Sequence, residues 1–440
     1  MLLTEREIVL PQCKSDSPLL AYFKRSLQDH FGTDEIPVRF VVTQNDSDGY
    51  HCELGVLSGL NDLSVPRPAS IFDFIPRKIE NNDKFNAVLL IPTGIGAEIG
   101  GHAGDAGPVA RLLSCACDTL ITHPNVVNAS DINELPENGL YVEGSVICQL
   151  LMGTAGLQKV RANRIMLVID KHQDNRISDL TINAASAARV TLGTDCPLVV
   201  EMDPPIQMQA RHSASGRAVG QVESLERLCE VLYRHRLKYD AVALASVVDV
   251  PNEVQMEYFQ SQGEIVNPWG GVEAMLTHAV AMLFGVPVAH SPMLESMEML
   301  NLRLSVVDPR MSPEAVSICF LHCVLKGLHR SPHIVKDSIV FNHPGVLSAA
   351  DVSCLVIPDG CIGLPTLAAL EQGIPVIAVR ENRNRMKNNL EKLPFVTGKF
   401  FIVDNYLEAV GIMMALKAGV TPHTVRRPLA KTEVCIERSG

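Results

Sequence analysis

The stretch 91–108, which reads IPTGIGAEIGGHAGDAGP, decides the fold class of this chain. It places six glycines directly after an apolar run, 85–91, and before a helix-like segment, 109–117. A strand, a glycine-rich loop and a helix in this order present backbone N–H groups and a helix N-terminus to an anionic ligand. The sequence therefore predicts an α/β protein with a ligand-binding loop at this point.

The glycine-rich loop also carries ionisable side chains, which a simple turn would not need. Its spacing, G94-x-G96-x-x-x-G100, differs from the dinucleotide-binding pattern by one residue, and the lysine of a P-loop is absent. We expect the loop to face the main cleft, with His102 and Asp105 in catalysis; an ordinary glycine-rich crossover is the alternative. The loop residues expected to contact the substrate are Gly94, Gly96, Glu98, Gly100 and Gly101.

The composition is that of a globular protein of two or three domains. The chain has 440 residues and a net charge of −11 without a basic block, which argues against nucleic acid and anionic membranes as partners. It shows neither a signal peptide nor an apolar run of membrane-spanning length. The twelve cysteines include no C-x-x-C pair, which favours free thiols in a reducing compartment. We therefore expect a soluble, cytoplasmic protein that forms a homo-oligomer, most simply a homodimer.

Apolar runs alternate with helix-like segments from residue 85 onward, which is typical of parallel sheets with helices on both faces. The expected strands are 85–91, 118–122, 164–169, 197–201, 241–246, 286–290, 302–307, 337–341, 353–357 and 374–379. Helices are expected at 272–283, 312–328 and 366–372, the last ending at a glycine C-cap.

The residues before the glycine-rich loop predict a small α+β segment. It contains a helix at 18–31, a strand at 37–43, a turn at 45–49 and a returning strand at 50–57. The expected domains are an N-terminal α+β segment at 1–82, a Rossmann-like domain with the glycine-rich loop at 83–300, a second Rossmann-like domain at 301–430 and a tail at 431–440.

Polar side chains follow four consecutive predicted strands, at the points where the strands end. In doubly wound sheets, ligands sit beyond the carboxyl ends of the strands, so these loops should share one pocket. We expect His123 to act as an acid or base, and Arg211 and Arg217 to clamp an anion. The alternative for each loop is an ordinary exposed polar loop. The other pocket residues expected from these loops are Asn125, Asn128, Lys171, His172 and His212.

Two further turns contain candidate site residues. Cys361 follows Asp359 at the end of a strand and precedes a helix, whose N-terminus would lower the pKa of the thiol. We expect Cys361 to be a nucleophile and Asp359 to contact the substrate; a small residue filling a tight turn is the alternative for the cysteine. Trp269, in the turn NPWGG at 267–271, either forms a wall of the ligand site or fills a domain junction.

Two resemblances add to these observations. The segments GIGAEIGGHAGDAGP, THPNVVNASDINELPEN and PDGCIGLPTLAALEQGIPVIAVREN resemble a family of uncharacterised bacterial and cyanobacterial proteins known by a domain of unknown function. This resemblance covers most of the chain after about residue 85 and implies no activity. Residues 348–379 are similar to the nucleotide-sugar half of B-type glycosyltransferases, although Asp359-Gly360-Cys361 replaces the usual glycine turn of that family.

Together, these features predict an α/β enzyme with two Rossmann-like domains. We expect it to act on a small anionic metabolite, such as an amino or carboxylic acid, as a lyase, hydrolase or isomerase. The alternatives are a B-type glycosyltransferase or sugar-nucleotide epimerase, and a non-catalytic protein that senses a nucleotide. No motif identifies a cofactor. The spacing of His102, Asp105 and His123 matches no metal motif, so no metal site is predicted.

Overall fold

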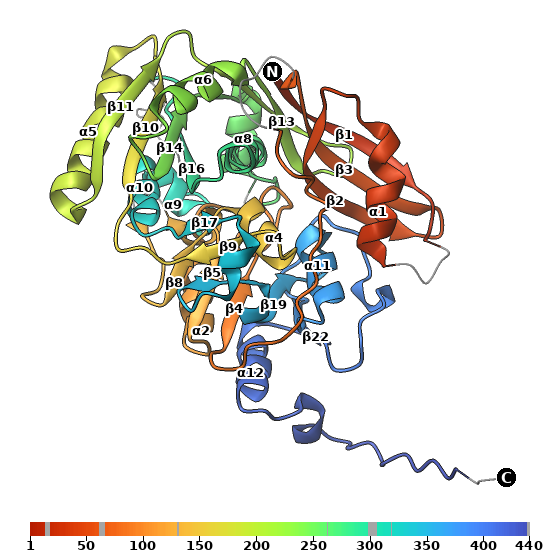
Figure 1. Cartoon of the computed structure of the whole chain (residues 1–440). Helices are drawn as coiled ribbons and strands as arrows, with labels where there is room; N and C mark the ends of the chain where they lie inside the picture. The colour runs from red at the N-terminus through yellow and green to blue at the C-terminus, as the bar shows by residue number, and fades with distance from the viewer. Residues whose placement is uncertain are drawn as a thin grey trace.

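The computed structural model describes residues 1–13, 18–60, 67–129, 132–261, 263–297, 306–317 and 319–437. In this part of the chain, three large sheets and the helices around them form the α/β fold that the sequence predicts. Figure 1 shows the three sheets arranged around a helix near the centre of the molecule.

The first large sheet has six parallel strands. From edge to edge they are β8 (Gly139–Tyr141), β5 (Thr119–Thr122), β4 (Asn86–Leu89), β19 (Val352–Pro358), β21 (Val376–Val379) and β22 (Phe400–Val403). By position in the chain this order is 3-2-1-4-5-6, the doubly wound order of dinucleotide-binding folds, with its switch point between β4 and β19. Residues 142–351 are inserted between its third and fourth strands.

Helices pack on the six-stranded sheet in two pairs. Helix α2 (Gly107–Ser114) contacts α12 (Tyr406–Lys417), and α4 (Gly144–Leu151) contacts α11 (Leu364–Gln372). Every residue of β4, β5 and β21 is buried, as expected for parallel strands covered on both faces. Helix α11 ends at Gly373 in the left-handed conformation, as predicted.

The second large sheet has four parallel strands and lies within the inserted segment. Its strands, in order, are β11 (Asp195–Met202), β10 (Arg164–Asp170), β14 (Ala241–Ser246) and β16 (Val288–Pro292). The helices beside it are α5 (Asn175–Leu192), α6 (Leu225–His235) and α10 (Leu321–His329). Helix α10 packs on both β14 and β16.

The third large sheet combines the N-terminal segment with strands from the insertion. Its order is β15 (Val248–Asp249), β12 (Gln207–His212), β13 (Ala218–Glu223), β1 (Leu2–Leu10), β3 (Gly49–Ser58), β2 (Ile36–Asp46) and β20 (Ile362–Gly363). The predicted hairpin is present as β2 and β3, with α1 (Leu19–Leu27) packed beside it.

Helix α8 (Trp269–Phe284) lies between these sheets and contacts β2, β12, β13, β16 and α4. Most of its residues are apolar and buried, as expected for a helix that is surrounded by protein. Its polar exceptions, Glu273, Thr277 and His278, therefore need specific partners inside the molecule.

Smaller elements complete the described chain. They are α3 (Pro124–Val127), β6 (Asn128–Ala129), β7 (Ile132–Asn133), β9 (Gly156–Gln158), α7 (Asn252–Gln260), α9 (Ser312–Val316), β17 (His333–Val335), β18 (Val346–Leu347) and the 3-10 helices η1 (Gln28–His30), η4 (Ser338–Asn342), η5 (Ala349–Asp351), η6 (Leu390–Lys392) and η7 (Pro422–Val425).

The structure corrects three expectations about the elements after residue 300. The strands there do not form a sheet of their own, because β19, β21 and β22 complete the six-stranded sheet. The helix expected at 312–328 is split into α9 and α10, since the backbone becomes extended at Ser317. The strand expected at 337–341 is the 3-10 helix η4, capped by the side chain of Asp337. The strand expected at 302–307 lies largely outside the described residues.

We expect Gly104→Ala to destabilise the protein more than Gly193→Ala does. Both glycines have a left-handed backbone, but a Cβ at Gly104 would lie 2.3 Å from the Cα of Ala129, whereas a Cβ at Gly193 would meet nothing within 4 Å. The free energy of unfolding, measured with urea, should fall by roughly 2–4 kcal/mol for Gly104→Ala and by about 1 kcal/mol for Gly193→Ala. Equal losses would contradict the close packing of this loop.

Candidate functional site

A cavity of about 660 Å³ opens at the carboxyl ends of β4, β5, β8 and β19. Thr93 follows β4, His123 and Asn125 follow β5, Glu143 follows β8, and Cys361 follows β19. The cavity therefore includes the switch point of the six-stranded sheet, where ligands bind in doubly wound folds.

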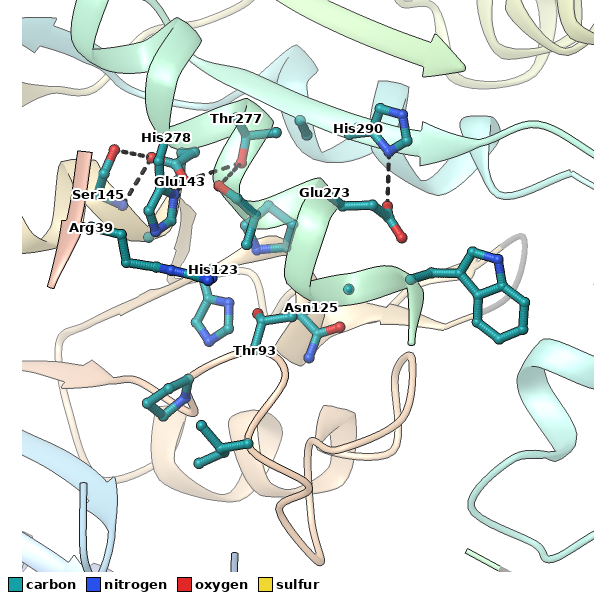
Figure 2. Close-up of a pocket in the computed structure, with 18 of the residues that line it drawn as sticks. Arg39, Thr93, His123, Asn125, Glu143, Ser145, Glu273, Thr277, His278 and His290 are labelled. Carbon is teal, nitrogen blue, oxygen red and sulfur yellow. Dashed lines mark hydrogen bonds and ion pairs between the residues drawn. The ribbon is translucent and has the colours of Figure 1, made fainter. Parts of the chain in front are cut away.

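One side of helix α8 forms the opposite wall of the cavity. Glu273, Thr277 and His278 line the cavity at helical spacing, and Trp269 lies at the start of the helix. Figure 2 shows Thr93, His123 and Asn125 on one side of the cavity and α8 on the other, with Glu273 directed toward His290 and Arg39 of β2 near His123. The site is thus built from all three large sheets and the central helix.

The buried carboxylate of Glu143 joins the six-stranded sheet to α8. It accepts hydrogen bonds from Nδ1 of His278 at 2.5 Å, from the Thr277 hydroxyl at 3.2 Å, and from the amide at 2.9 Å and the hydroxyl of Ser145. Burial alone would raise the pKa of Glu143, but the interactions with His278 and Ser145 outweigh it, so the pKa is lowered. Glu143 is therefore a carboxylate at neutral pH.

This carboxylate orients the imidazole of His278 toward the cavity. The side chain of His278 is 16% exposed, whereas that of Glu143 is 3% exposed, so the imidazole is on the cavity side. An ionised Glu143 requires a proton on Nδ1 of His278, so in the neutral form of this imidazole Nε2 carries the lone pair. No described residue hydrogen-bonds to that Nε2. Nε2 of His278 is thus open to a ligand.

His123 lies beside this pair as a neutral imidazole. The Ile91 N–H donates to its Nε2 at 3.3 Å, which places the proton on Nδ1. Burial lowers the pKa of His123 to about 4, although the nearby charge of Glu143 acts in the opposite direction. At neutral pH His123 is therefore a neutral imidazole with an N–H donor at Nδ1.

A second glutamate–histidine pair joins Glu273, nearer the start of α8, to His290 of β16. Nδ1 of His290 is 2.9 Å from Oε2 of Glu273, and Nε2 of His290 is 2.6 Å from the hydroxyl of Ser246. In this pair the order is reversed, because the side chain of Glu273 is 19% exposed and that of His290 only 1%. The carboxylate is on the cavity side and the imidazole is behind it.

The arginines that line the cavity are already paired with carboxylates. Arg39 donates to Glu5 at 2.9 Å, and Arg217 bonds to Glu53 and reaches Glu5 at 3.3 Å. These two cations and two anions cancel, so the cluster adds little net positive charge to the cavity. Arg211, the other member of the predicted anion clamp, is exposed and does not line the cavity.

The glycine-rich loop packs closely against the protein. Thr93 lines the cavity, but a Cβ at Gly94 would lie 2.7 Å from the carbonyl oxygen of Ala218, and one at Gly101 would lie 2.1 Å from that of Ala97. These glycines are required because other backbone comes so near. The structure therefore gives them a packing role, where the sequence predicted contact with substrate.

His102 and Asp105 of this loop belong to a separate buried network. Nδ1 of His102 lies 2.7 Å from the hydroxyl of Tyr258, which donates to the carboxylate of Glu314 at 2.8 Å. Oδ1 of Asp105 accepts the Gly100 N–H, and Oδ2 is buried with no partner among the described residues. Burial lowers the pKa of His102 to about 4 and raises that of Asp105 to about 7. Neither side chain lines the cavity, so the geometry does not support their predicted catalytic roles.

Cys361 lines the cavity, but its thiol is not activated. The residue is 4% exposed and lies ahead of α11, which begins at Leu364. Burial raises the pKa of the thiol well above its ordinary value. The lowered pKa expected from the sequence is therefore wrong, because loss of solvation outweighs the helix N-terminus.

Six residues predicted from the sequence line the cavity: His123, Asn125, Asn128, Arg217, Trp269 and Cys361. The others lie outside it: Gly94, Gly96, Glu98, Gly100, Gly101, His102, Asp105, Lys171, His172, Arg211, His212 and Asp359. Among these, Glu98 forms an ion pair with Arg310 at 2.8 Å, and Lys171 forms one with Asp203 at 3.1 Å.

The sequence reasoning missed both glutamate–histidine pairs. Glu143 and His290 stand at or near the ends of short apolar strands, where no motif marks them. A signal was present for Glu273 and His278. Both are polar residues within the apolar run 272–283, and polar side chains in a buried helix require a partner or access to a cavity. Among the described residues, no group of three or more His, Cys, Asp or Glu side chains is arranged to hold a metal ion.

Comparisons with known proteins identify relatives. A family model described as "Protein of unknown function (DUF3326)" matches residues 86–426. An uncharacterised lipoprotein of Synechococcus sp. is 35% identical over 343 residues, which cover 76% of this chain and 92% of that protein. No solved structure matches the chain. The predicted resemblance to an uncharacterised bacterial family is confirmed, and the resemblance to glycosyltransferases gains no support.

The relative also corrects the expected location. Its name identifies it as a lipoprotein, which contradicts the cytoplasmic location expected from the sequence. Within the described ranges, the helices are too short or too polar to cross a membrane.

We expect Asp105→Asn to stabilise the protein at neutral and alkaline pH. Burial raises the folded-state pKa of Asp105 to about 7, so its contribution to stability is fully present below its ordinary pKa of about 4 and is lost as the pH rises from there through about 7. The variant should match wild type at pH 4 and exceed its free energy of unfolding by on the order of 1–3 kcal/mol at pH 8.5, measured with urea. Asp83→Asn, at an exposed position, is the control. A variant that is less stable than wild type at pH 8.5 would contradict this assignment.

Proposed function

The chain belongs to this family of proteins of unknown function, DUF3326, and we propose that its cavity is the active site of an enzyme that moves a proton on a small carboxylic or carbonyl metabolite. The observation that carries the proposal is the imidazole of His278, whose Nε2 faces the cavity while the buried carboxylate of Glu143 binds Nδ1 at 2.5 Å. A base that is oriented by a buried third group is the arrangement that acid–base catalysis needs.

The two neighbouring histidines differ in the way that such a reaction requires. His278 accepts a proton from the carbon next to a carbonyl or carboxyl group, and Glu143 stabilises the imidazolium that forms. The electron pair of the broken C–H bond moves to the substrate oxygen, where the Nδ1–H of His123 donates a hydrogen bond. Because the pKa of His123 is about 4, it remains a neutral donor while His278 changes its charge.

The surroundings favour an anionic group on the substrate. The first turns of α4, α8 and α11 reach the cavity at Gly144, Gly270 and Pro365, and helix N-termini attract negative charge. This field supports the anionic substrate that the sequence suggested, although the paired arginines contribute little net charge. Cys361 has no part in this reaction, because its thiol stays protonated.

The proposal is tested by hydrogen exchange, which can be followed before the product of the reaction is identified. The protein is incubated in D2O with the proteinogenic L-amino acids, L-lactate and L-malate, and loss of the Cα–H signal is followed by 1H NMR. We expect at least one acid to exchange, and His278→Asn to slow that exchange at least ~100-fold.

His423→Asn, at an exposed position outside the cavity, is the matched control and should exchange at the wild-type rate. The melting temperature of each variant checks that it is folded. Exchange at the wild-type rate in His278→Asn would remove the assigned base. Binding of an acid, seen as a raised melting temperature, without exchange of any would favour a sensor over an enzyme.

A further inference from the structure

We infer that Lys336 binds a second anionic group of the substrate, at a subsite more than one helical turn away from His278. Because it rests on the proposed function, this assignment defines the substrate class of the same cavity. The substrates are elongated acids that carry one anionic group near the reacting carbon and another, a carboxylate or a phosphate, at the far end.

Lys336 is the cation of the cavity that is left without a carboxylate. Among the described Lys and Arg side chains, Arg39, Arg217 and Lys336 line the cavity, and both arginines are bonded to glutamates. No described carboxylate forms an ion pair with Lys336, whose Nζ donates to the carbonyl oxygen of Met282 at 3.3 Å. The charge of Lys336 is therefore available to an anion that enters the cavity.

The carboxylate next to Lys336 in the chain does not compensate this charge. Asp337 accepts the Ile339 N–H at 2.9 Å, which caps η4, and it does not line the cavity. Lys336 itself is exposed where it lines the cavity, but the protein around it removes part of its hydration and lowers its pKa. An anion beside the ammonium group would offset this loss of solvation.

Two neutral polar side chains line the cavity near Lys336. The register of β17 and β9 pairs Val335 with Gly156, which brings Thr154, just before β9, close to Lys336. The hydroxyl of Thr154 donates to the carbonyl oxygen of Gln149 at 3.3 Å, so these two residues are adjacent. No described residue hydrogen-bonds to the side-chain amide of Gln149, which leaves its N–H groups as further donors to an anion.

Two helices place this subsite relative to His278. On α8, Met282 is four positions after His278 and therefore lies on the same face, one turn further on. On α4, a Cβ at Gly144 would lie 3.3 Å from Cε1 of His278, and Gln149 is again more than one turn beyond. Because helical side chains lean toward the N-terminus, the imidazole leans away from Lys336. The rise of one turn is thus a minimum, and the separation is on the order of 6–10 Å.

This separation determines which acids fit the cavity. A molecule that contacts both His278 and Lys336 is longer than lactate or malate, and the cavity of about 660 Å³ has room for it. Its reacting carbon lies at His278, with the Nδ1–H of His123 as hydrogen-bond donor. Lys336 takes part in binding and transfers no proton, so it is a specificity-determining residue.

The experiment compares acids that differ in the second anionic group. L-α-aminoadipate and L-α-aminopimelate are paired with L-norleucine and L-α-aminoheptanoate, which have the same numbers of carbons. O-phospho-L-serine is paired with L-serine, which distinguishes phosphate from carboxylate. Dissociation constants are measured by isothermal titration calorimetry. We expect wild type to bind at least one doubly anionic acid at least ~10-fold more tightly than its partner, and Lys336→Met to lose this preference while it binds the partner unchanged.

Lys159→Met is the matched control. Lys159 is also an exposed lysine whose pKa is lowered by burial, and its Nζ donates to the Thr119 hydroxyl at 3.3 Å, but it does not line the cavity. This variant should bind every acid as wild type does. His278→Asn should keep the preference for the second anionic group and lose Cα–H exchange, because the base and the subsite are separate.

The remaining outcomes are decisive in different ways. If Lys336→Met weakens both members of a pair equally, Lys336 only caps the C-terminus of α8 and the subsite is overturned. A wild-type protein that binds no doubly anionic acid more tightly than its partner also overturns it. A preference that depends on Lys336, without exchange of any acid, would uphold the subsite and overturn the proposed function.

Discussion

The buried carboxylate of Glu143 must be surrounded by hydrogen-bond donors, and the arrangement of the helices around the cavity depends on this requirement. Glu143 follows the edge strand of the six-stranded sheet, and its donors come from α4 and from α8. An ionised carboxylate without these donors would be very unfavourable in the interior, and removal of one partner of a buried pair typically costs ~3–5 kcal/mol. The same interactions that stabilise Glu143 therefore fix α8 against the sheet and orient His278.

Helix α8 links Glu143 to the other two large sheets, because it also packs against their strands. Its apolar residues contact two sheets and α4, so polar side chains are tolerated only where they find a partner or face the cavity. Glu273 and His278 meet this condition in opposite ways. In the pair with His290 the carboxylate of Glu273 is the more exposed partner, whereas in the pair with Glu143 the imidazole of His278 is. One rigid helix thus holds a carboxylate and an imidazole in fixed positions, which a mobile loop would not do as well.

Much of the local structure was predictable, because it follows from short-range patterns. The hairpin of β2 and β3, the strand before the glycine-rich loop, and α11 with its cap at Gly373 all appear where the sequence places them. Sheet membership was not predictable in this way. The pairing of β1 with β13 and of β4 with β19 joins residues more than 200 positions apart, and no local pattern specifies such partners. The pair of Glu143 and His278, 135 positions apart, was hidden for the same reason.

The glycine-rich loop lies next to the cavity, as its sequence pattern predicts, but its glycines do not form the anion-binding surface that the pattern suggests. The doubly wound order does place the cavity at the switch point between β4 and β19, beside this loop. However, a loop that cradles phosphate must leave its glycines open to the ligand, and here Gly94 and Gly101 approach the backbone of Ala218 and Ala97 instead. The space at the switch point is lined instead by His123 and by the inserted helix α8. Residues 142–351, inserted into a strand order known from dinucleotide-binding folds, thus supply α8 as the opposite wall of the cavity.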